Sequence, residues 1–168
     1  MEKSLRMFKS TLLLTTLLFN TAYADYLNCP CKVVKVVDGD TVYVLDQAVE
    51  RHKIRLGGID APEHNQAFGN KSTDNLARLI AGKNINVEYV KRDKYGRIIG
   101  KLLMDDLDIN LQQIKDGFAW HYWHFKRDQS PVDRELYAKA EGQARAEKLG
   151  LWSAQAIAPW EFRRNKRK

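Results

Sequence analysis

Short runs of alternating apolar and polar residues dominate the first part of the chain. The run KVVKVV at 32–37 is rich in β-branched residues and predicts a strand. An Asp-Gly pair at 38–39 separates it from TVYVLD at 41–46, where valines alternate with a tyrosine. An Asp-Gly pair between two alternating runs is typical of a β-hairpin. The run RHKIRLGGI at 51–59 predicts a third strand.

The pattern then changes to helical spacing and back. Apolar residues recur on one side of 67–80, and Gly82 follows, so we expect a helix that ends there. Two further strands are predicted at 85–92 and 97–104, joined by the turn sequence DKYG.

Two helices are expected in the last third of the chain. Asn110 is a suitable N-cap for LQQIKD at 111–116, and Gly117 ends that helix. The second is predicted over 133–148, with Gly150 just past its end.

The predicted order is three strands, one helix, two strands and two helices. Five short strands leave exposed edges in a flat sheet, whereas a closed barrel leaves none. Gly57 and Gly58 suit a sharp bend in a barrel strand. We therefore expect an α+β protein: a five-stranded OB-fold β-barrel with three packed α-helices.

The first 24 residues have the pattern of a secretory signal peptide. Three basic residues precede the apolar run 11–19, and Ala22-Tyr23-Ala24 follows it. The run is shorter than the ~20 residues that span a bilayer, which disfavours the alternative of a membrane anchor. We expect export to the periplasm or the medium, with cleavage after Ala24.

The charge of the chain is concentrated at its end. Residues 1–24 hold three basic and one acidic side chains, so the other 144 residues carry 25 basic and 20 acidic ones, a net of +5. The final RRNKRK holds five basic residues. We expect an extension at 25–31, a domain at 32–153 and a basic tail at 154–168, either simply frayed or in contact with phosphates.

The two cysteines, Cys29 and Cys31, flank Pro30. A bridge between them needs a tight bend and closes a very small loop, so it constrains the unfolded chain little. Export makes a bridge plausible, and the sequence leaves the redox state open.

Charged residues gather at three predicted strand ends. They lie in DGDT at 38–41, in RLGGIDAPE at 55–63 and in DKYGR at 93–97. Each motif alone is more typical of a plain turn or loop. On one small barrel, however, they are able to share one rim.

The residue types on that rim suit attack on a phosphodiester. Asp40 and Asp60 are hard oxygen ligands of the kind Ca²⁺ prefers. Arg55 and Arg97 offer planar donor forks that match phosphate oxygens. Glu63 is placed to orient or deprotonate a water molecule.

These motifs, together with the closing KLGLWS, resemble the staphylococcal nuclease family in order and spacing over roughly 32–153. The resemblance implies an OB-fold enzyme that hydrolyses DNA and RNA with one Ca²⁺ ion and leaves 3′-phosphates. It implies single-stranded or locally opened nucleic acid as the substrate.

The resemblance also assigns roles to single residues. It implies that Asp40, Asp60 and the backbone carbonyl of Ala61 hold the cation, and that Arg55, Glu63 and Arg97 are catalytic. The expected substrate-binding residues are Lys94, Tyr95, Trp123 and Phe125. Trp123 and Phe125 stand where the family has tyrosines, so base stacking survives but a hydroxyl hydrogen bond is lost. Trp120, nearer the helix, has core packing as its alternative.

Other functions fit the same sequence. A noncatalytic OB-fold module would bind single strands through the aromatic residues and the basic tail, but it does not explain carboxylates placed beside phosphates. A calcium-stabilised structural domain is a further alternative. His121 and His124 would bind a metal ion only if their rings faced one way, and His64 is expected in a solvated loop.

Overall fold

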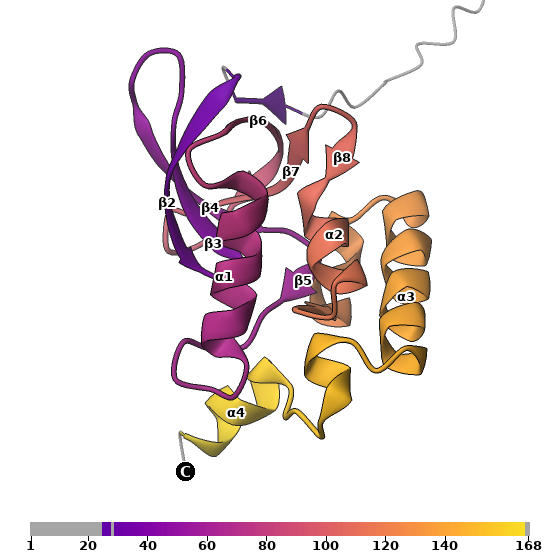
Figure 1. Cartoon of the computed structure of the whole chain (residues 1–168). Helices are drawn as coiled ribbons and strands as arrows, with labels where there is room; N and C mark the ends of the chain where they lie inside the picture. The colour runs from indigo at the N-terminus through magenta and orange to yellow at the C-terminus, as the bar shows by residue number, and fades with distance from the viewer. Residues whose placement is uncertain (1–24, 28, 167–168) are drawn as a thin grey trace, which may run out of the picture.

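The computed structural model describes residues 25–27 and 29–166; the predicted signal peptide lies outside them. A barrel dominates the fold (Figure 1). Its five strands are β2 (Cys31–Asp38), β3 (Thr41–Leu45), β4 (Arg51–Leu56), β6 (Asn84–Arg92) and β7 (Ile98–Met104). Because β6 pairs with both β2 and β7, the sheet closes on itself, which confirms the predicted five-stranded barrel.

One seam of the barrel differs from the others. β4 and β7 run parallel, with Leu56 opposite Gly100, whereas the other barrel pairs are antiparallel. Two short strands extend the edges: β1 (Asp25–Tyr26) pairs with β6, and β8 (Leu107–Asp108) pairs with β7.

The barrel interior and the inner helix faces form one apolar core. Alternate residues of the strands point inward, as the sequence pattern predicts. The largest fully buried aliphatic side chains are Ile54, Leu56, Ile59, Leu76, Ile80, Ile85, Ile98, Leu102, Ile109, Ile114 and Leu151.

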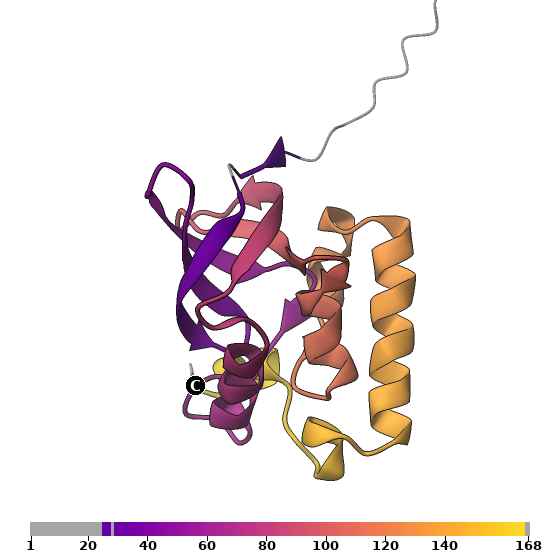
Figure 2. The same cartoon turned by 45° about the horizontal axis from the view of Figure 1, so that its top comes forward.

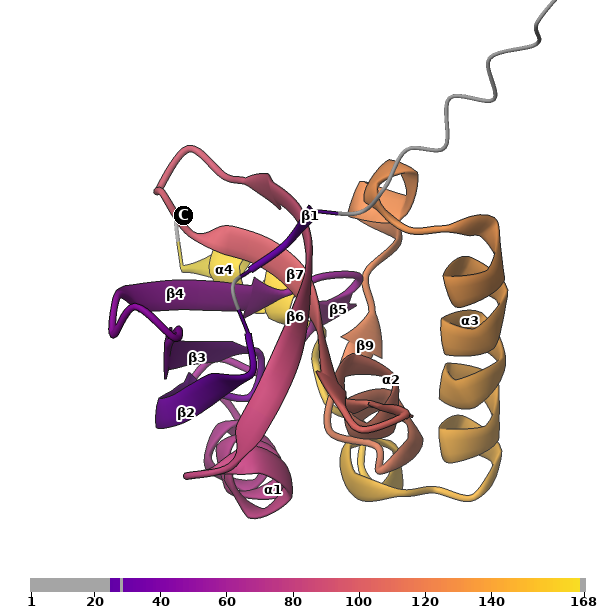
Figure 3. The ribbon, with the colours of Figure 1, turned by 90° about the horizontal axis from the view of Figure 1, so that it is seen from above.

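The helices lie on one side and one end of the barrel. They are α1 (Gly69–Ile80), α2 (Ile109–Lys115), α3 (Pro131–Ala146) and α4 (Pro159–Asn165), with 3₁₀ turns η1 (Trp123–Asp128) and η2 (Gly150–Ser153). α2 lies between the barrel and α3, which is outermost (Figures 2 and 3). No helix within 25–27 and 29–166 has the length and apolar character needed to cross a membrane.

The helix cap predicted at Asn110 is wrong. Asp108 caps α2 instead, because its Oδ1 accepts a hydrogen bond from the Leu111 N–H at 2.9 Å. Asn110 is fully buried, and its side-chain amide donates to the carbonyls of Gly57 and Gly100 at 3.0 and 3.1 Å. It therefore bridges the parallel seam rather than starting the helix.

The predicted strand at 51–59 is interrupted. Gly57 and Gly58 form a turn, and Gly58 has a φ of +73°, which favours glycine. The chain then forms β5 (Ile59–Asp60), which pairs with β9 (Trp120–His121) outside the barrel. The two glycines thus mark the bend that the sequence indicates.

Both ends of the described chain are more structured than the extension and the basic tail expected from the sequence. Cys29 and Cys31 form a disulfide. Residues 159–165 fold as α4 with Pro159 in its first turn, rather than as a frayed basic tail. The basic end of the chain is thus tied to the body of the protein.

Candidate active site

The turn between β2 and β3 positions Asp40. In this turn, the Gly39 carbonyl accepts a hydrogen bond from Gln113 Nε2 of α2 at 2.7 Å. A Cβ atom at Gly39 would lie 1.9 Å from Ser72 Oγ and 2.8 Å from the Ala61 Cβ. The DGDT motif is therefore a hairpin turn pressed against α1 and α2, and close packing requires its glycine.

Asp60 is positioned by a different pair of strands. Its backbone lies in β5, opposite Trp120 of β9, at the point where the chain leaves the barrel. Asp60 and Asp40 are both buried, with 1% and 6% of their surface exposed. The Ala61 N–H, next to Asp60, donates to Asp40 Oδ2 at 2.7 Å and so ties the two segments together.

Arg55 joins the two aspartates. Its Nη2 lies 3.0 Å from Asp40 Oδ2 and 2.9 Å from Asp60 Oδ1. Its Nη1 donates to the backbone carbonyls of Leu56 and Ile59 at 2.7 and 3.0 Å. The guanidinium is thus held in place by four acceptors, and both carboxylates face it.

Burial raises the pKa values of two carboxyl groups at the site. Burial, and then the neighbouring Asp40 carboxylate, raise the pKa of Asp38 to about 7. Burial also raises the pKa of Asp60, although Arg163 and Arg55 act in the opposite direction. Burying a carboxylate costs solvation free energy, and a bound cation would offset that cost. A site with several buried carboxyl groups is therefore suited to receive a cation.

Glu63 lies in the loop after Pro62. Its backbone N–H donates to Gln66 Oε1 at 3.1 Å, and its carbonyl accepts from the Gln66 N–H at 2.8 Å. Its side chain is 38% exposed and pairs with Arg163 Nη1 at 2.7 Å. Arg163 also contacts Asp60, so Glu63 and Asp60 lie on one face.

The donor set fits a hard divalent cation. Carboxylates from two separate segments converge on one nitrogen of Arg55, and Asp60 and Glu63 converge on Arg163. Carboxylate and carbonyl oxygens are the ligands Ca²⁺ takes. Asp40 and Asp60 are therefore the residues that could hold such an ion.

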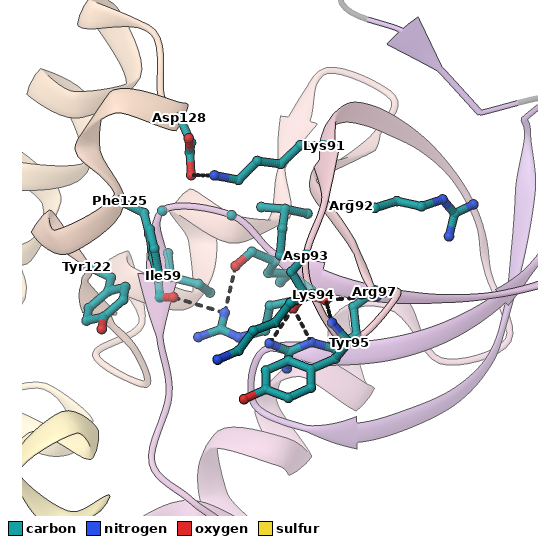
Figure 4. Close-up of a pocket in the computed structure, with 15 residues that line it drawn as sticks. Ile59, Lys91, Arg92, Asp93, Lys94, Tyr95, Arg97, Tyr122, Phe125 and Asp128 are labelled. Carbon is teal, nitrogen blue, oxygen red and sulfur yellow. Dashed lines mark hydrogen bonds and ion pairs between the residues drawn. The ribbon is translucent and has the colours of Figure 1, made fainter. Parts of the chain in front are cut away.

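A cavity of about 510 Å³ opens beside Arg55 (Figure 4). Lys94, Tyr95 and Arg97 line it from the turn after β6, and Tyr122 and Phe125 line it from the opposite wall. The structure thus brings both predicted catalytic arginines to one cavity, together with three of the four predicted substrate-binding residues.

Arg97 is anchored at the cavity by its own turn. Its Nε and Nη2 each lie 2.8 Å from Asp93 Oδ2. Burial works against ionisation of Asp93, but the hydrogen bonds from the Arg97 side chain and backbone hold the pKa of Asp93 below its usual value. The DKYGR motif therefore holds the Arg97 guanidinium group at the cavity rather than forming only a surface loop.

The aromatic segment divides between three environments. Phe125 lines the cavity, with Lys91 Nζ 5.6 Å from its ring centroid. Trp123 lies outside it, in a groove with Pro131 of α3, so its position does not support the expected substrate contact. The 3₁₀ turn gives the inner position to Tyr122 instead. Trp120 is buried, which corresponds to its core alternative.

The histidines do not form a common site. His121 is buried, with Nε2 3.0 Å from Gln129 Oε1, while the His124 ring stacks on Tyr122 at 4.9 Å. His64 is exposed, as expected.

A second carboxylate and histidine cluster lies in the turn after β3. The ligand atoms of Asp46, Glu50 and His52 lie within 4.8 Å of one another. Asp46 Oδ1 accepts the N–H groups of Ala48 and Glu50, and its Oδ2 lies 2.9 Å from His52 Nε2. These contacts account for the cluster as a structural turn.

Sequence reasoning missed three groups at the site. Asp38 precedes the glycine of DGDT, and only its burial beside Asp40 reveals its perturbed pKa. Tyr122 lies in the aromatic segment, whose inward face depends on the 3₁₀ turn. Arg163 was assigned to the basic tail, and the Pro159-Trp160 pair before it was the available signal of a helix.

Comparison with known proteins places this geometry in a family. The family described as staphylococcal nuclease homologue matches residues 53–154. An uncharacterized endonuclease of Escherichia coli is 42% identical over 137 residues, covering 80% of this chain and 85% of the relative.

Two further relatives agree. A micrococcal nuclease of Shigella flexneri is 36% identical over 155 residues, covering 85% of this chain and 83% of the relative. An uncharacterized endonuclease of Haemophilus influenzae is 36% identical over 138 residues, covering 82% and 74%. The chain therefore belongs to the staphylococcal nuclease family, as its sequence motifs predict.

Proposed function

We propose that this protein is an exported, Ca²⁺-dependent, sugar-nonspecific endonuclease that hydrolyses DNA and RNA and leaves 3′-phosphates. The observation that carries the proposal is the convergence of Asp40 and Asp60 on Arg55, beside a cavity that Arg97 also lines. Family membership supports the nuclease activity, and the donor set supports the choice of cation.

The geometry supports a separate role for each of the acidic residues. Asp40, Asp60 and the carbonyl of Ala61 hold the ion, which supplies Lewis-acid stabilisation of phosphoryl charge when bound. Glu63, half-exposed at the edge of the site, accepts a proton from the attacking water.

The two arginines hold the phosphoryl group. Asp93 engages Nε and Nη2 of Arg97, which leaves Nη1 for a phosphate oxygen. Arg55 lies between the carboxylates and the cavity, so its positive charge offsets negative charge on either side.

Low sequence specificity follows from the kind of contact. Phosphate contacts carry no sequence information, and aromatic faces stack on any base. Lys94, Tyr95, Tyr122 and Phe125 are the side chains placed for such binding. The substrate is a single strand or a locally opened duplex, because a stacked base must leave its helix to reach the cavity.

Export is supported by the sequence of the first 24 residues and by the Cys29–Cys31 disulfide. Disulfides persist in oxidising compartments. We propose cleavage after Ala24 and a final location in the periplasm or the medium. N-terminal sequencing of the exported protein tests this, and a chain that still begins at Met1 would contradict it.

The activity is tested on heat-denatured DNA and on RNA, with Ca²⁺ or with a chelator. We expect fragments of both polymers only with Ca²⁺, with 3′-phosphate ends that resist extension until a phosphatase removes them. Glu63→Gln is expected to slow cleavage at least 100-fold, in line with the usual contribution of a general base. A strand that shifts in a gel but stays intact would instead indicate a noncatalytic binding module.

A further inference from the structure

A third arginine reaches the carboxylates from the far end of the chain. Arg163 of α4 has Nη2 2.7 Å from Asp60 Oδ2 and Nη1 2.7 Å from Glu63 Oε1, with Nη1 also 3.3 Å from Asp60 Oδ1. These two carboxylates are the ones that the proposed function uses for the cation and for the water. α4 therefore brings a second guanidinium group to Asp60, which Arg55 also contacts.

The two arginines that share Asp60 are held very differently. The Arg55 side chain is 14% exposed and donates to two backbone carbonyls as well as to the aspartates. The Arg163 side chain is 37% exposed, and it bonds only carboxylates in the contacts described. Of the two, Arg163 is the one that is able to leave.

α4 itself is attached through few contacts. It is seven residues long, and only Pro159 in it is buried. Trp160 packs against Tyr122, Trp120 and His124, with ring centroids 5.5, 6.2 and 6.2 Å apart, and Gln66 donates to the carbonyl of Ile157 just before the helix. Elements with little buried surface open at low free-energy cost.

Arg163 and a divalent cation need the same oxygen atoms. Arg55 takes Asp60 Oδ1, and Arg163 takes Oδ2 and the Glu63 carboxylate. An ion that binds Asp60 through the oxygen atoms that Arg163 contacts therefore competes with that guanidinium group, whereas Arg55 is fixed in place by the backbone. The positive charge of Arg163 also opposes a second cation at the same place.

We propose that α4 is a strap whose Arg163 competes with the divalent cation for Asp60 and Glu63. When the cation is scarce, Arg163 pairs with the carboxylates of Asp60 and Glu63. When the cation binds, Arg163 and α4 are released from them. Arg163 thus sets the cation concentration at which the site fills. This inference rests on the proposed cation site at Asp40 and Asp60.

Calorimetric Ca²⁺ titration of the substrate-free protein tests the competition. A site open about one-tenth of the time binds its ligand about tenfold more weakly than a fully open one. We therefore expect Arg163→Ala to bind Ca²⁺ about tenfold more tightly than the unchanged protein. Arg163→Lys, which keeps the charge, should retain most of the weaker affinity. Arg164→Ala, an exposed neighbour on the same helix, is the matched control and should bind like the unchanged protein.

Hydrogen exchange supplies a readout that does not depend on activity. We expect Ca²⁺ to speed amide exchange in 160–166 of the unchanged protein. In Arg163→Ala the same amides should exchange fast without Ca²⁺, while α1 and the barrel stay protected. Thermal melts of each variant establish that the barrel is folded.

The outcomes separate the strap from the cation site beneath it. Equal or weaker Ca²⁺ affinity in folded Arg163→Ala, with binding still abolished by Asp40→Asn, overturns the strap and leaves the cation site standing. Absence of Ca²⁺ binding in every variant, or binding that Asp40→Asn does not change, overturns the cation site and the strap with it.

Discussion

Asp40 and Asp60 meet at a single nitrogen atom: Arg55 Nη2 lies within 3.0 Å of a carboxylate oxygen of each. The two aspartates come from a hairpin turn of the barrel and from a short strand outside it. The meeting point therefore depends on the barrel and on the β5–β9 pair together, and the site exists only in the folded protein.

Arg55 contributes to both stability and activity. Arg55→Ala removes the ion-pair partner of the buried Asp40 carboxylate and leaves Asp60 with Arg163 alone, and losing one partner of a buried ion pair costs ~3–5 kcal/mol. We expect a lower free energy of unfolding in urea titrations as well as lost cleavage. Arg97→Ala removes an arginine that is 28% exposed, and it should lose cleavage with little change in stability. Equal stability of the two variants would contradict this division.

Gly39 is required by the close approach of α1. Because a Cβ there would overlap Ser72 and Ala61, we expect Gly39→Ala to lower the free energy of unfolding by ~1–3 kcal/mol. The matched control is Gly142→Ala in α3, where nothing lies within 4 Å of the new atom. That change should stabilise the protein by ~0.5–1 kcal/mol, because alanine favours a helix over glycine. Denaturant titrations of both variants give the comparison.

Asn110 bridges the parallel seam of the barrel. Asn110→Ala would leave the carbonyls of Gly57 and Gly100 and the N–H of Leu102 without their side-chain partner. Each unsatisfied buried group costs ~1–3 kcal/mol, so we expect a loss of at least ~2 kcal/mol. Asp108→Ala removes the helix cap, the Tyr137 contact and a 4.0 Å ion pair with Lys101, and its loss should be smaller because the Asp108 side chain is 17% exposed. A larger loss for Asp108→Ala would contradict the bridging role of Asn110.

His121 makes the protein less stable in acid. Burial lowers the pKa of His121, although Gln129 and Glu141 act in the opposite direction. The unfolded chain therefore takes up the proton first as the pH falls through ~6.5, and stability present above that pH is lost below it. We expect His121→Asn to lose less stability between pH 7.5 and 5.5 than the unchanged protein.

Phe125 and Trp123 are similarly exposed, at 55% and 50%, but only Phe125 lines the cavity. Stacking contributes ~1–3 kcal/mol per base, so Phe125→Ala should raise the KM for single-stranded DNA about tenfold. Trp123→Ala should leave the KM near its original value, since its side chain faces the groove beside α3. Initial rates over a range of DNA concentrations measure both. A larger effect of Trp123 would instead favour the contact predicted from the sequence.

The barrel was predictable because local patterns define it. Asp-Gly at 38–39 and alternating valines specify a hairpin without reference to the rest of the fold. The helix at 131–146 was also found, although Ser130 and Pro131 start it earlier than the apolar pattern indicates. The motifs that carry charge were all located at strand ends.

The parts that escaped prediction depend on distant contacts. Asn110 has the chemistry of a helix cap, but burial against the seam gives it other partners. Trp123 and Tyr122 are adjacent in an aromatic run, and only the 3₁₀ turn decides which of them faces inward. Arg163 lies among other basic residues, and its partners Asp60 and Glu63 are about a hundred positions earlier.

The parallel seam between β4 and β7 determines how late in synthesis the barrel is able to close. β4 is synthesised with one edge unpaired, and its partner on that side follows only after α1 and β6. Such non-local pairing slows folding and leaves a strand edge open to other chains in the meantime. In the export proposed above, this late closure would leave the nascent polypeptide an unclosed barrel that is still able to pass through a membrane channel.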